Sequence, residues 1–544
     1  MNRIKDILRT LGTARGLFFI TLAVIIVPNV ALCFTEGMSL PACATNIVLP
    51  LAIYWFVMTL GRTPGKMTWV LFPFLFFAAF QIVLLYLFGR SVIAVDMFLN
   101  LVTTNPGEAM ELLDNLLLAV GTVVVLYVPV LTMAVVQWRR KLTVSGEFRL
   151  RQRRYSLCGI AAGIVLSAVS YATDIRYRFE LHLYPANVCY NLGLAVQRTM
   201  QTNAYPETSR DFRFNARATH AADDREVYVM VIGETARSLN FSLYGYKRPT
   251  TPLLQRTEGI TAFTDCRTQS NTTHKSVPML LSAASAEDYD RIYRERGIMS
   301  AFREAGFHTV FISAQRPNHS FIDIFGEEAD EWTFIRQTAK NPDAVKDKDM
   351  LPLVARALAS KHQKLFIVLH TYGSHFNYRE RYPAAEAYFK PDDATEAQPS
   401  NRRRLLNAYD NTVRYTDSFL HSLITSLAHQ RCVSALLYTS DHGENIFDDS
   451  RKLFLHASPI PSEYELPVPF IVWTSTDYSS RFPQTMAAMR ANRTKPMTSS
   501  ASAFHTMLDL AGIKTPVLAD SLSVASPRFK VRPYHYLNDH NKIN

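Results

Sequence analysis

The sequence predicts an N-terminal α-helical membrane domain with five spans, followed by a C-terminal α/β domain with a mainly parallel central sheet. Three observations lead to this prediction. Long apolar runs crowd the first third of the 544-residue chain, basic residues gather in alternate loops between them, and short apolar segments alternate with polar, periodic ones after residue 227. We therefore expect a membrane domain over 1–172, a juxtamembrane helix and linker over 173–226, and an outer α/β domain over 227–544.

Five apolar runs each approach the ~20 residues with which a helix crosses the hydrocarbon core of a bilayer. Charged residues are absent from them or confined to their ends. The runs are 17–34, 39–60, 67–88, 116–137 and 156–172. A single run of this kind can be a buried core helix, and a signal peptide would explain only the first. Five in succession predict a membrane domain.

The loops between the runs predict its orientation. Basic residues precede the first run, lie between the second and third, and are densest between the fourth and fifth. That last loop contains Arg139, Arg140, Lys141, Arg149, Arg151, Arg153 and Arg154. By contrast, the loop 89–115 contains only Arg90. The positive-inside rule then places the N-terminus in the cytoplasm and everything after about residue 173 outside, which is the periplasm in a Gram-negative cell.

The net charge of +11 does not require a nucleic-acid partner. Much of it belongs to the cytoplasmic loops, and the rest suits a surface that works beside anionic lipid. The six cysteines contain no CxxC pair, so a disulfide scaffold is not indicated. Cys33 and Cys43 flank the short outer loop and could pair in an oxidising compartment. Residues 183–201 read as a short amphipathic helix, either resting on the membrane surface or serving as an ordinary linker.

Apolar segments of strand length alternate with polar, periodic segments in the outer half. The candidate strands are Val227–Gly233, His308–Ser313, Leu365–His370, Ala435–Ser440 and Pro469–Thr474. Nearly continuous apolar strands that alternate with helices predict a parallel sheet covered on both faces. In such sheets ligands bind outside the carboxyl ends of the strands.

Carboxylate and imidazole side chains follow three of these strands. One strand ends in Glu234, another ends in His370 and leads to His375, and a third ends in Asp441 and His442. Such residues, without thiolates, suit zinc better than manganese. A nearby hydroxyl could complete the site as an activated nucleophile. The stretch 269–282 offers three candidates that the pattern does not separate: Thr272, Thr273 and Ser276.

Several motifs, in order and spacing, resemble the membrane phosphoethanolamine transferases, which include lipid A-modifying and mobile colistin-resistance proteins. The matching stretches are VIGETARSLNFSLYGYKRPTTPLL (231–254), TTHKSVPMLLS (272–282), LHTYGSHFNYRERYP (369–383), YTSDHGEN (438–445), LHASPIPSEYELPVPFIVW (455–473) and NLVTTNPGEAMELL (100–113). The five-span anchor matches as well. The resemblance implies that 227–544 is a periplasmic catalytic domain of the alkaline-phosphatase/sulfatase type.

The resemblance also implies which residues act. The family's zinc ligands fall on Glu234, Thr273, Asp441 and His442, and its threonine nucleophile falls on Thr273. One zinc ion is expected and a second is possible, with manganese the less suited metal. Glu444 would lie behind the ligands.

Five further residues match positions that bind substrate in the family. His375 and His456 match histidines around the donor phosphate or a second metal, where they would serve both catalysis and substrate binding. Asn100, Thr104 and Glu108 match loop residues that hold the phosphoethanolamine head group.

The sequence departs from the family at two points. Lipid A-type members carry several disulfides in the catalytic domain, which Cys266 and Cys432 cannot supply. The family's lysine near the donor phosphate has no clear counterpart in SAQRPNHSF, where Arg316 or His319 could substitute. Both points weaken lipid A as the acceptor and leave the chemistry intact.

The implied function is an inner-membrane, zinc-dependent transferase, active as a monomer. It would move phosphoethanolamine from phosphatidylethanolamine through a covalent Thr273 intermediate to an envelope acceptor such as lipid A, the lipopolysaccharide core or another glycan. One alternative is a phosphoglycerol transferase of the lipoteichoic-acid-synthase type. Another is a non-catalytic envelope sensor or assembly factor. A sulfatase is disfavoured because the Cys/Ser-x-Pro-x-Arg signature is missing.

Overall fold

The computed structural model describes the chain apart from residues 1–11, 89–91, 104–116, 222–223, 395–396 and 459. The chain divides into two compact units. One is made of Met1–Leu101 and Leu112–Gln197, and the other contains Arg198–Asn544. The finer three-part division at residues 172 and 226 stays a prediction.

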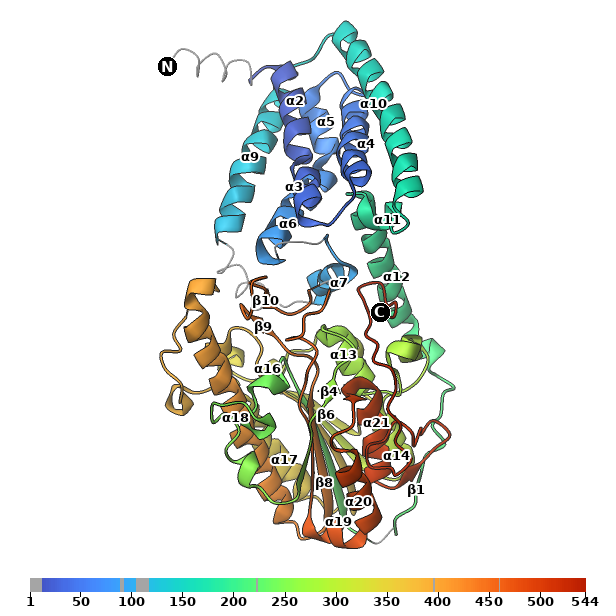
Figure 1. Ribbon diagram of the computed structural model, residues 1–544, viewed down its shortest axis with the longest axis vertical. Helices are drawn as coiled ribbons and strands as arrows, with labels where there is room; N and C mark the ends of the chain where they lie inside the picture. Colours follow the sequence, from blue (N-terminus) through green and yellow to red (C-terminus); the bar gives the residue numbers. More distant parts are fainter. Residues whose placement is uncertain (1–11, 89–91, 104–116, 222–223, 395–396, 459) are drawn as a thin grey trace. The chain divides into compact units, whose positions relative to one another are not determined.

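The first unit is helical (Figure 1). Its helices include α2 (Ala14–Ile25), α3 (Val27–Thr35), α4 (Leu40–Met58), α5 (Pro64–Val70), α6 (Phe72–Phe88), α9 (Leu117–Arg139) and α10 (Gly146–Thr173). Among the described residues, four segments are long and apolar enough to cross a membrane: Ala14–Thr35, Leu40–Met58, Leu118–Arg139 and Gly146–Thr173. The third predicted span is a bent pair, α5 and α6, which meet at 62° and raise the number of spans to five if counted as one.

Helices α4 and α10 approach each other closely because small residues lie between them. A Cβ atom on Gly163 of α10 would lie 2.7 Å from the Cβ of Leu49, and one on Gly159 would lie 2.9 Å from the Cβ of Ala52. Buried polar groups are paired along the same contact, as where the hydroxyls of Thr45 and Ser170 hydrogen-bond at 3.1 Å. Small residues and interhelical hydrogen bonds are what hold helices together in lipid.

All six cysteines lie within the described residues, and all are unpaired. The Sγ atom of Cys33 lies 3.6 Å from the carbonyl oxygen of Cys43, and the Sγ of Cys43 lies 3.8 Å from that of Cys33. The two thiols therefore face main-chain oxygens, and the possible Cys33–Cys43 disulfide is not formed in this structure.

A seven-stranded sheet forms the centre of the second unit, in the order β3-β11-β8-β2-β7-β5-β6. The strands are β2 (Glu226–Gly233), β3 (Ile260–Phe263), β5 (His308–Ser313), β6 (Glu331–Phe334), β7 (Lys364–His370), β8 (Val433–Ser440) and β11 (Phe470–Thr474). The five strands from β8 to β6 run parallel, whereas β11 is antiparallel to both β8 and β3. The predicted mainly parallel sheet is confirmed.

Each face of the sheet packs against helices. The odd-numbered residues of β2 from Val227 to Val231 belong to one core with α17 (Leu351–Leu358) and α18 (Arg402–Ala428). Its even-numbered residues from Tyr228 to Ile232 belong to a second core. The helices of that second core are α13 (Thr273–Leu280), α14 (Ile298–Glu304) and α21 (Ser499–Leu510) (Figure 1). Both faces of β2 are therefore buried, as its unbroken apolar sequence predicts.

The helix predicted over 183–201 is α12 (Ala186–Thr208), which follows the short α11 (Phe179–His182).

Candidate metal centre

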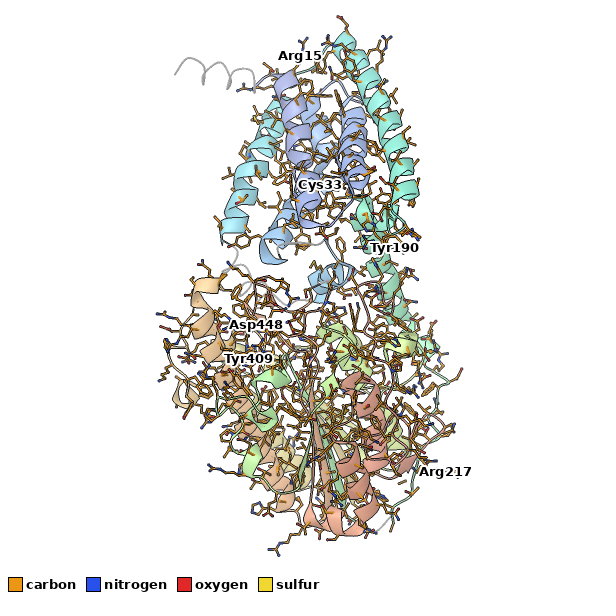
Figure 2. All side chains as sticks on the ribbon, viewed as in Figure 1. Arg15, Cys33, Tyr190, Arg217, Tyr409 and Asp448 are labelled. Atoms are coloured by element: carbon orange, nitrogen blue, oxygen red, sulfur yellow. The ribbon has the colours of Figure 1, made fainter. Side chains whose placement is uncertain are left out.

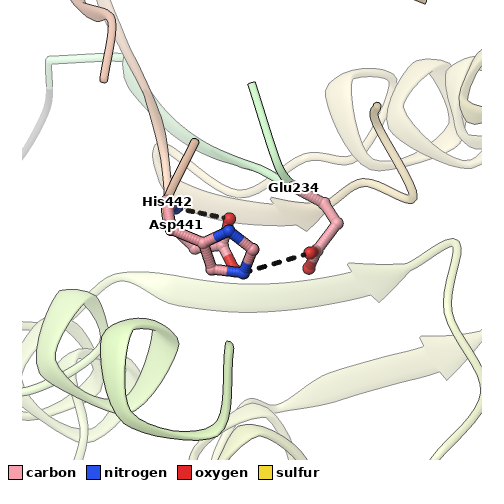
Figure 3. Close-up of side chains that lie close together, drawn as sticks. All are labelled: Glu234, Asp441 and His442. Carbon is pink, nitrogen blue, oxygen red and sulfur yellow. Dashed lines mark hydrogen bonds and ion pairs between the residues drawn. The ribbon is translucent and has the colours of Figure 1, made fainter. Parts of the chain in front are cut away.

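Three predicted metal ligands meet because β2 and β8 are neighbours in the sheet. Their parallel register places Gly233 opposite Ser440, and the main-chain N–H of Asp441 donates to the Gly233 oxygen at 3.0 Å. The residues that follow the two strands therefore leave the sheet side by side. One donor atom from each of Glu234, Asp441 and His442 lies within 4.8 Å of the others, and all three side chains are buried (Figure 3).

Thr273 brings a hydroxyl to this cluster from the first residue of α13. Its Oγ1 atom lies 3.0 Å from Nε2 of His442 and 3.3 Å from Oε1 of Glu234. The other two candidate hydroxyls bond elsewhere, that of Thr272 with Ser270 and that of Ser276 with the Thr272 carbonyl oxygen. Among the contacts of the described residues, Thr273 is thus the candidate that joins the cluster.

The hydrogen bonds of His442 fix which ring nitrogen carries its proton. Nδ1 lies 2.9 Å from the carbonyl oxygen of Gly443, which can only accept, so Nδ1 donates. Burial, together with the nearby His456, lowers the pKa of His442 to about 3, so the ring is neutral. Nε2 then presents a lone pair toward carboxylate oxygens, 3.1 Å from Asp441 Oδ2 and 3.5 Å from Glu234 Oε1. A carbonyl that fixes this tautomer is typical of metal-bound histidine.

Burial dominates the protonation of the two carboxylates, although the charge of His456 acts in the opposite direction. Burial and the neighbouring Asp441 raise the pKa of Glu234 to about 7, and burial raises the pKa of Asp441 to about 6. Asp441 Oδ1 accepts from the main-chain N–H groups of Thr235 and His442, at 2.9 and 2.7 Å. Its Oδ2 is buried and accepts no hydrogen bond within the described part of the chain. A buried oxygen of this kind is costly unless a cation binds it.

The donor set fits zinc. Two carboxylates, one neutral imidazole and one hydroxyl suit a borderline ion. Four of the six donor–donor separations are 3.0 to 3.5 Å, and the donors of Glu234 and Asp441 lie within 4.8 Å of each other. A tetrahedral site with bonds of ~2.0–2.2 Å has edges of about 3.3–3.6 Å. The side chains therefore need little movement to enclose the ion.

Thr235 holds an unusual backbone conformation beside the cluster. Its φ of +61° is strained for a β-branched residue. The surroundings stabilise it, because the Tyr409 hydroxyl donates to the Thr235 carbonyl oxygen at 2.8 Å and accepts from the Arg237 N–H at 2.9 Å. Arg237 is held in turn by a buried ion pair with Asp448 at 2.7 Å; Tyr409 and Asp448 are labelled in Figure 2. The strained residue directly follows Glu234, one of the three clustered side chains.

Gln315 also reaches the cluster, although the sequence did not single it out. Its amide donates to Glu234 Oε2 at 3.2 Å and to the Thr371 carbonyl oxygen at 2.9 Å. The two predicted lysine substitutes make other contacts: Arg316 pairs with Asp343, and the His319 N–H donates to Asp323. Within the described contacts, Gln315 is the residue of this loop that touches a predicted ligand.

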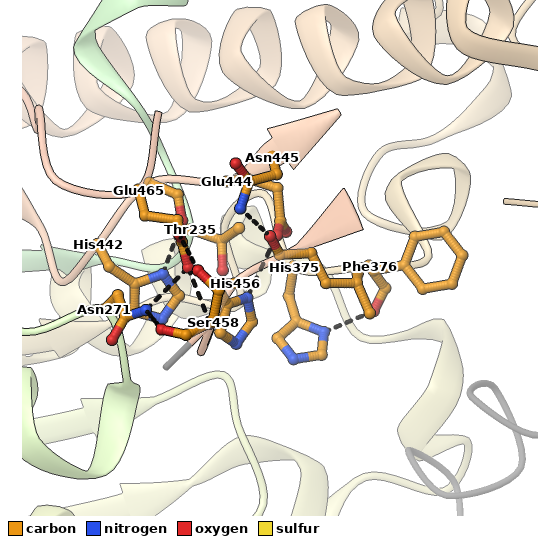
Figure 4. Close-up of polar contacts among 12 residues, drawn as sticks. Thr235, Asn271, His375, Phe376, His442, Glu444, Asn445, His456, Ser458 and Glu465 are labelled. Carbon is orange, nitrogen blue, oxygen red and sulfur yellow. Dashed lines mark hydrogen bonds and ion pairs between the residues drawn. The ribbon is translucent and has the colours of Figure 1, made fainter. Parts of the chain in front are cut away.

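Two more predicted residues, His375 and His456, lie beside His442 (Figure 4). The ring centroid of His456 is 4.1 Å from that of His442 and 6.1 Å from that of His375. Burial alone would lower the pKa of His456, but Glu444, 3.3 Å away, and the other carboxylates raise it to about 9. Burial and Arg381 hold the pKa of His375 well below its usual value. At neutral pH, one histidine is therefore a cation and the other is neutral.

A buried carboxylate, Glu465, joins the loops that carry these residues (Figure 4). It accepts from the Asn271 amide at 2.8 Å, from the Ser458 N–H at 3.2 Å and from the Ser462 N–H at 2.7 Å. Its own carbonyl oxygen accepts from the Gly443 N–H at 2.7 Å. Sequence reasoning missed Glu465 because a glutamate between proline-rich turns carries no local signal of its partners.

The predicted head-group residues fall largely outside the described residues. Thr104 and Glu108 are not described. Asn100 lies in helix α7 (Val95–Thr103), but its side chain is not described. Their role stays a prediction.

Comparisons with known proteins agree with this architecture. The Kdo(2)-lipid A phosphoethanolamine 7''-transferase of Escherichia coli is 29% identical over 310 residues, which cover 54% of this chain and 52% of the relative. This chain thus spans about half the length of the curated relatives it matches. The resemblance to phosphoethanolamine transferases is confirmed.

Two solved structures share the fold. The integral membrane protein lipooligosaccharide phosphoethanolamine transferase A from Neisseria meningitidis has a TM-score of 0.73 at 21% identity, covering 95% of this chain and 97% of that protein. The C-terminal periplasmic domain of EptC from Escherichia coli, solved in a complex with zinc, has a TM-score of 0.56 at 24% identity, covering 61% and 95%.

A family model described as Sulfatase matches residues 226–513, more than half of the chain and the whole region from Glu234 to His456. The chain therefore belongs to the Sulfatase family.

Proposed function

We propose that the chain is an inner-membrane phosphoethanolamine transferase that uses Thr273 as its nucleophile. The single observation that carries the proposal is the position of the Thr273 hydroxyl, 3.0 Å from the unprotonated nitrogen of His442 and 3.3 Å from Glu234. The similarity to a Kdo(2)-lipid A phosphoethanolamine 7''-transferase supports phosphoethanolamine as the group that is transferred.

Glu234, Thr273, Asp441 and His442 would hold one zinc ion. The solved zinc complex of a related domain supports this choice of metal. Bound zinc would lower the pKa of the Thr273 hydroxyl and stabilise negative charge on phosphoryl oxygens.

The chain's own residues would then carry a two-step transfer. In the first step, the Thr273 hydroxyl loses its proton to water, its Oγ1 forms a bond to the phosphorus of phosphatidylethanolamine, and the bond from phosphorus to the diacylglycerol oxygen breaks. His456, protonated at neutral pH, gives its proton to that leaving oxygen. In the second step an acceptor oxygen attacks the same phosphorus and its proton passes to His456. The bond to Thr273 then breaks, and Thr273 Oγ1 takes a proton back from water.

The acceptor would be an envelope glycolipid or glycan, such as lipid A or the lipopolysaccharide core. A named relative acts on Kdo(2)-lipid A, which supports this class. The four or five candidate spans support an inner-membrane location. Cytoplasmic basic loops would place the second unit in the periplasm, where Asn100, Thr104 and Glu108 would hold the head group. The enzyme would act as a monomer.

The test is a pair of substitutions in α13. Thr273→Ala should reduce transfer from phosphatidylethanolamine to envelope glycolipids by at least ~1,000-fold. Mass spectrometry should also lose the phosphoethanolamine ester on the peptide that contains residue 273. Ser276→Ala removes a hydroxyl from the same helix turn and should keep most of the activity. Full activity in Thr273→Ala would refute the proposal.

A further inference from the structure

A cavity of about 210 Å³ lies in the second unit beside the loop that leads to Thr273. Most of its wall comes from three stretches of chain, 265–269, 496–502 and 529–534, and Ser285, Glu287 and Leu522 complete it. The proposed metal ligands are not among its lining residues. The cavity is therefore separate from the metal cluster, although its wall residue Gln269 is four positions before the nucleophile.

Three cationic side chains line the cavity: Arg267, Lys530 and Arg532. Within the described part of the chain, the contacts of Arg267 and Arg532 are with neutral groups. The Arg267 guanidinium lies 5.4 Å from the centre of the Tyr534 ring, and Arg532 donates to the Ser521 hydroxyl at 3.1 Å. These guanidiniums therefore retain most of their capacity to bind an anion.

The acidic side chains of the wall differ in how they are used. Glu287 accepts from the Gln269 amide at 3.1 Å and from His535 at 3.2 Å. Asp265 also lines the cavity, and its exposed carboxylate can accept from the hydroxyl groups of a ligand. Phe529 and Tyr534 add apolar ring surface. Guanidiniums, a carboxylate and aromatic rings together suit a sugar that carries its own negative charge.

The wall of the cavity is hydrogen-bonded to the nucleophile segment. The Tyr534 hydroxyl donates to the Thr268 carbonyl oxygen at 2.6 Å, and the Leu537 N–H donates to the Gln269 carbonyl oxygen at 2.8 Å. Further on, the Lys275 ammonium in the first turn of α13 donates to the Asn538 carbonyl oxygen at 3.0 Å. A ligand in the cavity would thus lie against the segment that leads to Thr273.

We propose that this cavity binds an anionic sugar residue of the acceptor glycan, with its phosphate or carboxylate group on Arg267 and Arg532 and its hydroxyl groups on Asp265. The assignment as an acceptor subsite rests on the proposed transferase function. The binding of an anionic sugar does not depend on the transferase function, and it can be measured separately.

The experiment is isothermal titration of the full chain in detergent with four probes: glucose 6-phosphate, glucuronate, glucose and inorganic phosphate. Glucose 6-phosphate or glucuronate should bind at least tenfold more tightly than glucose and inorganic phosphate. The double variant Arg267→Gln/Arg532→Gln should raise the dissociation constant at least tenfold. Arg528→Gln is the matched control, because that arginine is paired with Asp520 outside the cavity, and it should leave binding unchanged.

Two outcomes would overturn the proposal: unchanged affinity in the double variant with an unchanged melting temperature, or equal affinity for inorganic phosphate and glucose 6-phosphate. Thr273→Ala should bind the probes as the parent does. Failure of the transferase proposal would therefore appear as full activity in Thr273→Ala. Failure of the sugar-site proposal would appear in the titrations.

Discussion

The side-chain amide of Asn271 donates a 2.8 Å hydrogen bond to the buried carboxylate of Glu465, and this bond joins the nucleophile segment to the loop that carries His456. The main chains of both residues are hydrogen-bonded as well. The Ala457 N–H donates to the Asn271 carbonyl oxygen, and the Gly443 N–H donates to the Glu465 carbonyl oxygen. Three stretches of chain, far apart in sequence, are thereby fixed relative to one another by the side chains of Asn271 and Glu465 together with main-chain hydrogen bonds.

Glu465→Gln should disturb this arrangement while leaving the metal ligands in place. Its new amide group would face N–H donors where the carboxylate accepts, which costs about 1–3 kcal/mol. We expect a lower melting temperature and about tenfold slower transfer, with zinc content unchanged. Glu463→Gln is the matched control, since its side chain is 74% exposed. Wild-type activity in Glu465→Gln would show that this bond does not position the nucleophile.

Asp441→Ala should lose zinc. The substitution removes one proposed ligand and the oxygen that accepts no other bond, so we expect at least ~100-fold weaker affinity. Zinc per protein, measured by mass spectrometry of the purified full chain, checks it. Asp449→Ala, in the same loop but paired with Arg451, should keep its zinc. Stoichiometric zinc in Asp441→Ala would contradict the proposed ligand set.

His505 should make the second unit less stable in mild acid. Burial, with help from Arg291 and Arg532, lowers its pKa to about 4, below the ordinary value of about 6.5. The folded state favours the neutral ring. The contribution of His505 to the free energy of unfolding is therefore fully present above about pH 6.5 and falls as the pH drops toward 4. The loss reaches about 2 kcal/mol at pH 5.

Melting temperatures between pH 7.5 and pH 5 measure this effect. His505→Asn keeps an acceptor for the Ala519 N–H and should flatten the pH dependence of the melting temperature. An equal slope in both proteins would assign the acid sensitivity to other groups.

Gly163→Ala should destabilise the membrane unit. The added Cβ would lie 2.7 Å from the Cβ of Leu49, so α4 and α10 would have to separate at a cost of about 1–3 kcal/mol. Gly121→Ala in α9 is the control, because a Cβ there meets nothing within 4 Å. The fraction of full-length protein that stays unaggregated after heating in detergent should fall for the first variant and not for the second.

The parts of the fold with a continuous apolar signal were predictable from sequence. All five candidate strands are present, as β2, β5, β7, β8 and β11. β3 and β6 were missed because each has four residues, and β6 is partly exposed. The direction of β11 was also not predictable, since an apolar run carries no information on its orientation. The bend between α5 and α6 falls inside one unbroken apolar run.

The site was predictable where its residues follow strands. Glu234, Asp441 and His442 stand at strand ends, so sheet topology brings them together. Thr273 needed the motif, because hydroxyl-rich turns are common. Gln315 and Glu465 were missed because their roles depend on partners 81 and 194 positions away, Glu234 and Asn271.

The alternating burial of β2 has a consequence for protein engineering. Glu234 follows a strand whose successive side chains enter two different cores. Inserting or deleting one residue in β2 would move the strand's following side chains from one core to the other. It would also shift Glu234 by ~3.3 Å along the strand. Randomised libraries that aim to change substrate preference should therefore keep the length of this strand and vary the loops beyond it.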